Sequence, residues 1–141
     1  MIKLVVLIVS LLISGTAFAL DKEEWMYIAS SNYTDNFVNT KRILVIDRDS
    51  QTIEVWRKEV MTGLKKGDLS KVGDYMISKE EYQCINQRSK MVRILAYKKS
   101  GESEGQEFAN KYADWIDVVP GSVGESNLSA VCNYIFPKLP S

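Results

Sequence analysis

Residues 120–136 read PGSVGESNLSAVCNYIF, and this stretch decides the fold that we predict for the chain. A Pro-Gly pair opens it, and Ser122 followed three residues later by Glu125 has the form of a capping box, which marks the start of a helix. The helix is predicted to continue to about Phe136. Its apolar side chains recur at three- and four-residue spacings and share one face: Leu128, Val131, Cys132 and Ile135. Cys132 is therefore expected to point toward whatever the helix packs against.

The other cysteine is Cys84, and the chain has two cysteines in all. Pairing is the usual outcome for two cysteines in a protein exported to an oxidising compartment. The alternative is a reactive thiol or a metal ligand, but the sequence contains no histidine to activate a thiolate or to complete a common zinc site. We therefore predict a disulfide between Cys84 and Cys132. In the chain-entropy model, closing a loop of about 48 residues contributes roughly 4 kcal/mol to stability.

The segments before this helix have the pattern of β-strands. Runs rich in Ile, Val and aromatic residues are separated by residues with turn chemistry. The predicted strands cover residues 25–30, 42–47, 52–60, 74–84 and 91–98. Polar turns are predicted at residues 32–36, 48–51 and 100–105, and the turn at 48–51 predicts a hairpin between its flanking strands. Residues 61–73 hold three glycines and several charges, which predicts a long, mobile connection.

One later segment is ambiguous. Phe108, Tyr112, Trp115 and Ile116 lie at near-helical spacing, whereas residues 116–119 have the composition of a strand. We predict a strand for the second half of this segment.

The predicted strand 52–60 has two different faces. Ile53 and Val55 fall on one face, and Glu54 and Trp56 fall on the other, so that one face is apolar and the second is mixed. Trp56 and the aromatic residues near it are candidates for a binding face. We interpret their role as core packing.

The fold class predicted from these elements is α+β, a mainly antiparallel β-sheet with one C-terminal helix tethered by the disulfide. The chain begins with a signal-peptide pattern, which consists of Lys3, an apolar run over residues 4–13, and small residues leading to Ala19. We expect residues 1–19 to be removed by cleavage after Ala19, and residues 20–141 to form one domain. The apolar run is too short to cross a bilayer, so no stable membrane insertion is expected after cleavage, and the product would be periplasmic or secreted.

Composition argues against several classes of function. Lys3 lies in the predicted leader, which leaves 17 basic and 18 acidic residues in the exported part, and the nearest thing to a basic patch is Lys65-Lys66 in a predicted loop. We expect no nucleic-acid partner. Without histidine there is no Ser-His or Cys-His pair, and no Gly-rich phosphate loop is present, so we predict no enzyme, no cofactor and no metal site. The triplet at residues 47–49 departs from a calcium loop at its sixth and twelfth positions, and we interpret it as a turn.

The order of several features resembles the surface-adhesin protein E-like domain family of Gram-negative bacteria. The features are Trp25, the strand Ile53-Glu54-Val55-Trp56, Tyr82-Gln83-Cys84 followed by Arg88 and Tyr97, Trp115 leading into Val119-Pro120-Gly121-Ser122, and Cys132. Together they cover nearly the whole predicted exported part. The resemblance implies an antiparallel sheet with a disulfide-tethered C-terminal helix, which agrees with the prediction made from the residues.

The resemblance also implies a non-enzymatic role in attachment. The namesake adhesin binds host matrix or plasma proteins such as vitronectin, laminin and plasminogen, and it can form a dimer, so a homodimer is a possible state here. That adhesin is a surface lipoprotein, whereas this chain lacks a cysteine at the expected cleavage site. Two alternatives remain open, a periplasmic envelope or inhibitor-like factor and a small carboxylate-based hydrolase. The hydrolase would need two carboxylates across a cleft.

Overall fold

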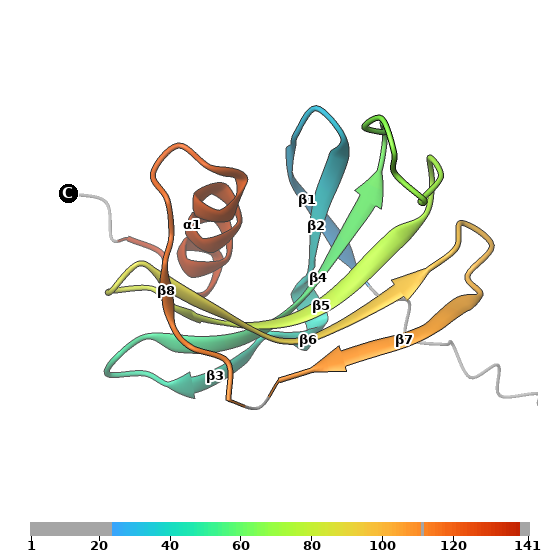
Figure 1. The fold of residues 1–141 in the computed structure, drawn as a ribbon. Helices are drawn as coiled ribbons and strands as arrows, with labels where there is room; N and C mark the ends of the chain where they lie inside the picture. The colour runs from blue at the N-terminus through green and yellow to red at the C-terminus, as the bar shows by residue number, and fades with distance from the viewer. Residues whose placement is uncertain (1–23, 111, 139–141) are drawn as a thin grey trace, which may run out of the picture.

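The computed structural model describes residues 24–110 and 112–138, so the predicted leader at residues 1–19 lies outside the described residues. A curved antiparallel sheet with α1 packed on one face makes up the structure (Figure 1). The strands are β1 (Trp25–Ser30), β2 (Thr34–Asn39), β3 (Leu44–Asp47), β4 (Thr52–Met61), β5 (Tyr75–Gln83), β6 (Arg88–Tyr97), β7 (Ser103–Ala109) and β8 (Ile116–Asp117). A 3-10 turn, η1 (Thr40–Arg42), precedes β3, and α1 (Val123–Ile135) ends the described elements.

The strands pair in the order β1-β2-β4-β5-β6-β7, and every pair is antiparallel. The two long strands β4 and β6 each have two partners on one side. β3 pairs with the first part of β4 and β2 with its second part, while β8 and β7 share β6 in the same way. The α+β class and the single C-terminal helix are thus confirmed.

The helix α1 begins with the capping box that its sequence predicts. The Ser122 hydroxyl accepts a hydrogen bond from the Glu125 backbone N–H at 3.2 Å, and the Glu125 carboxylate accepts one from the Gly121 N–H at 2.7 Å. These contacts satisfy two donors near the helix start, as in a capping box. Leu128 and Val131 are fully buried, and Cys132 is also buried, so the predicted apolar face packs on the sheet.

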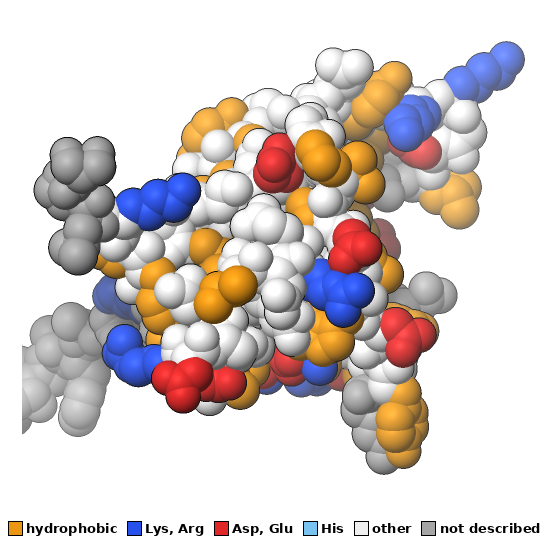
Figure 2. Space-filling model, turned by 90° about the vertical axis from the view of Figure 1, so that its left-hand side faces the viewer, with side chains coloured by type: hydrophobic (Ala, Val, Ile, Leu, Met, Phe, Trp, Pro, Cys, Tyr) orange, Lys and Arg blue, Asp and Glu red, His pale blue; other side chains and the backbone are white. Residues whose placement is uncertain are grey.

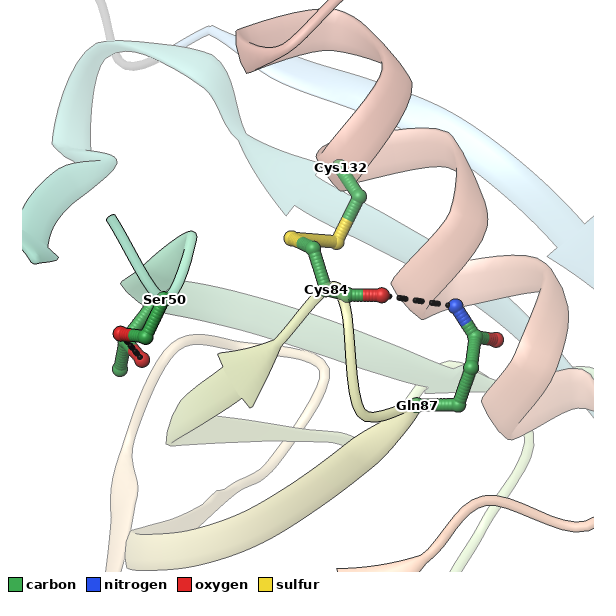
Figure 3. The surroundings of a disulfide bond; sticks show 5 residues. Ser50, Cys84, Gln87 and Cys132 are labelled. Atoms are coloured by element: carbon green, nitrogen blue, oxygen red, sulfur yellow. Dashed lines mark hydrogen bonds between the residues drawn. A yellow bond between two sulfur atoms is a disulfide. The ribbon is translucent and has the colours of Figure 1, made fainter. Parts of the chain in front are cut away.

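The core lies between α1 and one end of the central strands, where the first half of β4 pairs with the second half of β5. Its fully buried apolar side chains include Val38 of β2, Ile53 and Val55 of β4, and Tyr82 of β5. Cys84 follows β5 directly and forms a disulfide with Cys132 of α1, with a Cα–Cα distance of 5.7 Å. Figure 3 shows this bond, with the Gln87 side chain donating a hydrogen bond to the Cys84 carbonyl at 2.9 Å.

Two strands were missed by the sequence prediction. Residues 32–36 were predicted as a turn, but β2 begins at Thr34, because Thr34 and Asn36 are buried and paired through hydrogen bonds rather than solvated. The turn predicted at 100–105 is shorter, since β7 begins at Ser103 and pairs with β6 as an edge strand. A polar edge strand lacks the apolar alternation on which the prediction relied.

The predicted strand 42–47 begins later than expected, at Leu44. The Asn39 side chain accepts a hydrogen bond from the Lys41 N–H at 3.1 Å, which forms the tight turn η1 over the first of these residues. The hairpin of β3 and β4 is confirmed, and so is a strand within 116–119, as the two-residue β8. Residues 62–74 connect β4 to β5 without a helix or strand.

A buried polar network lies beneath α1. Arg57 of β4 donates to the Glu80 carboxylate of β5 at 2.7 Å and to the Asn36 side chain of β2 at 2.6 Å. The Tyr82 hydroxyl donates to Glu80 at 2.9 Å. Burial, and then the adjacent carboxylate, raise the pKa of Tyr82 well above its usual value, so this hydroxyl stays a donor. The Asn127 side chain of α1 donates to Asn36 at 3.5 Å and joins the helix to the network.

We predict that the double variant Cys84→Ser, Cys132→Ser is less stable by about 4 kcal/mol, because the unfolded chain loses its closed loop. The measurement is the free energy of unfolding in guanidinium chloride, with chemically reduced wild type as the control. If the double variant and the reduced wild type both have the same free energy of unfolding as the oxidised protein, the disulfide does not stabilise the fold.

We predict that Glu80→Ala costs about 3–5 kcal/mol, because the Arg57 guanidinium would remain buried without its carboxylate. The control is Glu102→Ala in the exposed Lys98–Glu102 pair, where a loss of about 0–1 kcal/mol is expected. Equal losses for the two variants, measured by chemical unfolding, would contradict a stabilising role for the buried network.

Candidate functional site

Figure 1 shows that one side of the sheet is turned away from α1. The strand pairings place on this side aromatic side chains that the core does not contain. Because successive strand residues point to opposite faces, Ile53 and Val55 enter the core and Trp56 points away from it. We call this side the open face and define it by these strand residues: Trp25, Tyr27, Phe37, Asn39, Leu44, Glu54, Trp56, Lys58, Tyr75, Ile77, Lys79, Glu81, Lys90, Arg93, Leu95, Tyr97 and Glu107.

All three tryptophans of the chain contact lysines of the open face. The ammonium groups lie over the ring centroids at 5.7 Å for Lys58 and Trp25, 5.4 Å for Lys79 and Trp56, and 4.8 Å for Lys90 and Trp115. Lys58 also lies 4.5 Å from the Tyr75 ring, which stacks on Tyr97 at 5.1 Å. These distances fall within the range of cation–π attraction, so the lysines hold the rings in place at half-buried positions.

The carboxylates of the open face are engaged in cross-strand ion pairs. Lys79 contacts Glu54 at 2.9 Å, and Lys90 contacts Glu81 at 2.8 Å. Glu54 and Glu81 are direct partners across β4 and β5, so two carboxylates are neighbours on this face. Each is bound by a lysine, and neither lines the pocket described next.

A pocket of about 270 Å³ opens on this face. Trp25 of β1, Trp56 of β4 and Tyr97 of β6 form aromatic walls, and Ile77 and Leu95 contribute apolar surface between them. Since β1 and β6 are separated by three strands in the sheet order, the sheet must curl for both to line one pocket.

The polar lining of the pocket consists of Asn39, Arg42 and Arg93. Asn39 is 1% exposed, and its side-chain oxygen is used by the Lys41 N–H, whereas its Nδ2 has no hydrogen-bond partner in the part of the chain described. Arg93 binds Glu107 at 2.5 Å, but its Nε likewise lacks an acceptor among those residues. Both unpaired nitrogens are themselves buried, and an unpaired buried donor costs about 1–3 kcal/mol.

The structure corrects the expectation that Trp56 packs in the core. Trp56 lies on the opposite face from the buried cluster and lines the pocket. Arg93, Leu95 and Tyr97 lie in the strand predicted at residues 91–98, but the sequence did not assign them to a face of the sheet. Asn39 and Arg42 were missed as site residues, because Asn39 ends β2, a strand that the sequence did not predict, and Arg42 lies in the turn η1 that follows it.

The other residues singled out from the sequence lie apart from this pocket. Residues 47–49 form the β3–β4 turn, where the Ser50 hydroxyl and the Asp49 N–H bind the Asp47 carboxylate and lower its pKa. No group of three or more metal-binding side chains occurs among residues 24–110 and 112–138.

Lys65 and Lys66 are exposed in the β4–β5 connection. On the side of the molecule in Figure 2, acidic and basic side chains are interspersed.

A family model described as surface-adhesin protein E matches residues 22–133, which is most of the chain. The chain belongs to the surface-adhesin protein E family. Comparison with curated proteins finds no match, and neither does comparison with solved structures. Membership in the family indicates an exported, adhesin-like binding protein with a non-enzymatic role. No helix in the described part of the chain is long and apolar enough to cross a membrane.

The residues that carry the family resemblance divide between the two faces of the sheet. Ile53, Val55, Tyr82 and the two cysteines build the core under α1. The aromatic members of the pattern gather on or against the open face: Trp25, Trp56, Tyr97 and Trp115. A surface-adhesin protein E domain of this kind therefore presents its aromatic residues on the side that the helix leaves uncovered.

We predict that Trp56→Ala destabilises the protein less than Ile53→Ala. Ile53 is fully buried and its truncation should cost about 2–5 kcal/mol, whereas Trp56 is half-buried beside a pocket that already admits solvent. Chemical unfolding of the two variants measures the difference. A larger loss of stability for Trp56→Ala than for Ile53→Ala would indicate that Trp56 packs in the core.

Proposed function

We propose that this surface-adhesin protein E domain is an exported protein-binding module and that the open face is its binding surface. The observation that carries the proposal is the gathering of three tryptophans and a pocket on the sheet face opposite α1. Tryptophan and arginine are the residue types that most often dominate the energy of protein interfaces. The partners proposed are host extracellular-matrix or plasma proteins, in keeping with the family description.

Apolar surface around the pocket supports a protein partner. Tyr27 shares the open face through its pairing with Phe37, and it is 54% exposed. Leu44 of β3 lies opposite Glu54 and is 58% exposed. Large apolar side chains exposed around a recessed aromatic centre are typical of an interaction site.

In this proposal residues 1–19 are removed as a signal peptide, and residues 20–141 are the exported domain. The intact mass of protein recovered after export should match cleavage after Ala19, and it should rise on reduction by the two hydrogens that one disulfide takes up. A mass that retains the first 19 residues would contradict the proposed processing.

The binding test uses the exported protein against immobilised vitronectin, laminin and plasminogen, measured by surface plasmon resonance. Trp25→Ala and Trp56→Ala should each weaken binding to a recognised protein at least tenfold. The matched control is Tyr134→Ala, because Tyr134 is a half-exposed aromatic residue on α1, away from the open face. Equal loss for all three variants, or no loss for either tryptophan, would remove the open face as the binding surface.

The second candidate is a periplasmic envelope factor that meets its partner inside the cell envelope. Fractionation of the native host separates the two roles. An adhesin must be found on the surface or in the medium, so a protein confined to the periplasm would contradict host binding while leaving the open face as a surface for another protein.

A further inference from the structure

The pocket on the open face offers no uncompensated charge to a ligand. Of its two arginines, Arg93 is paired with the Glu107 carboxylate, and Arg42 also has an interaction partner. No acidic side chain of the described residues lines the pocket. A charged ligand would therefore lose hydration here without gaining an ion pair, which favours a neutral ligand.

The indole N–H groups of Trp25 and Trp56 are free hydrogen-bond donors. Both rings line the pocket, and neither N–H makes a hydrogen bond within residues 24–110 and 112–138. Neither N–H is among the buried atoms that lack a partner, so both are reached by solvent. The hydroxyl of Tyr97, the third aromatic wall, has the same two properties. A ligand in contact with these rings therefore meets donors that it can use.

The lining of the pocket is poor in hydrogen-bond acceptors. The Asn39 oxygen already accepts from the Lys41 N–H, and guanidinium and indole groups only donate. This disfavours a sugar, because the hydroxyl hydrogens of a sugar need acceptors. It favours a peptide segment that has carbonyl oxygens but few N–H groups. Proline supplies this combination, since it has a carbonyl and no backbone N–H.

The surfaces that the two indoles turn to the pocket are not covered by lysine. Lys58 lies over the Trp25 ring and Lys79 over the Trp56 ring, but neither lysine lines the pocket. Aromatic-lined grooves of this kind bind proline-rich segments in the polyproline II conformation. The volume of about 270 Å³ lies just below the ~300–1,000 Å³ of small-molecule sites, which suits one or two side chains of a peptide.

The register of the sheet sets the spacing of the two tryptophans. Trp25 pairs with Asn39 across β1 and β2. The register of β2 and β4, continued by one residue, places Asn39 opposite Trp56, so both tryptophans lie in one cross-strand row. Two strand spacings amount to roughly 10 Å, and one three-residue turn of a polyproline II helix rises about 9 Å. Prolines three residues apart therefore match the two tryptophans.

We propose that this pocket binds a neutral, proline-rich segment of a partner protein in the polyproline II conformation, with prolines three residues apart. The proline rings pack against Trp25 and Trp56, and the indole N–H groups donate to carbonyl oxygens of the segment. This inference rests on the proposed function and states which chemistry the binding surface recognises.

The test titrates the exported, disulfide-bonded protein with the capped peptide acetyl-Ser-Leu-Pro-Ala-Leu-Pro-Ser-amide. One control peptide has alanine in place of both prolines. A second, acetyl-Ser-Pro-Leu-Ala-Leu-Pro-Ser-amide, has the same composition with its prolines four residues apart. The indole N–H signals of the three tryptophans, assigned through Trp→Phe variants, report binding by NMR.

We expect the first peptide to shift the Trp25 and Trp56 signals and to bind roughly tenfold more tightly than either control peptide. Because no ion pair forms, the affinity should stay the same as salt rises from roughly 50 to 500 mM. A strong loss of affinity at high salt would show that the contact is ionic and would contradict the inference.

Two variants examine the donors. Trp25→Phe and Trp56→Phe each remove one indole N–H while keeping an aromatic ring, so each should weaken binding of the first peptide roughly tenfold. The matched control is Tyr134→Phe, which removes an aromatic donor from a half-exposed position on α1 and should leave binding unchanged. If a tryptophan variant does not fold, the peptide comparison still decides the question.

Several results would overturn the inference. Equal affinity for the three peptides, or shifts confined to Trp115, would exclude proline recognition in this pocket. Equal or tighter binding of methyl α-mannoside would assign the pocket to a sugar. The chain itself has prolines three residues apart, at residues 137 and 140. Self-association of the protein that is reversed by the peptide of residues 136–141, Phe-Pro-Lys-Leu-Pro-Ser, would assign the pocket to a second copy instead of a partner.

Failure of this inference can be told apart from failure of the proposed function. If host-protein binding remains sensitive to Trp56→Ala while the peptides are not distinguished, this inference fails and the proposed function stands. If the peptides behave as expected while no matrix or plasma protein binds, the host partners are wrong and the chemistry of the pocket stands.

Discussion

The covalent bond between Cys84 and Cys132 decides which face of the sheet the helix covers. Cys84 follows β5 directly, and Cys132 lies on the apolar stripe of α1, so the bond holds that stripe against Ile53, Val55 and Tyr82. The single helix covers one end of one face of the sheet and leaves the other face free. The aromatic residues of the free face are therefore available because the helix is held on the other side.

The polar network under α1 adds directional contacts to this attachment. Arg57 joins β2 and β5 through Asn36 and Glu80, and Asn127 extends the network to the helix. A buried guanidinium is costly unless it is paired, so the network favours the observed register of β2, β4 and β5, and Asn127 adds one contact from the helix. The apolar stripe thus stabilises the attachment of α1 by burying apolar surface, and the network adds directional hydrogen bonds.

On the open face, single lysines perform two tasks. Lys79 pairs with Glu54 and lies over Trp56, and Lys90 pairs with Glu81 and lies over Trp115. Cross-strand pairs of this kind stabilise neighbouring strands and at the same time hold large rings at a half-buried surface. A rigid aromatic surface loses little conformational entropy when a partner binds, which fits the binding role of a surface-adhesin protein E domain.

Several elements could be predicted because their signals are local in the sequence. The capping box and the apolar spacing of residues 122–135 predicted the helix, alternation predicted most of β4, β5 and β6, and two cysteines in an export context predicted the disulfide. Local signals could not show that the polar segment at Thr34 begins a buried strand, since its burial depends on hydrogen bonds that Asn36 makes with distant residues. The position of Trp56 in a pocket could not be predicted from local signals either. Alternation separates the two faces of a strand, but which face meets the helix depends on strand order and on the position of Cys84, and both are long-range properties of the fold.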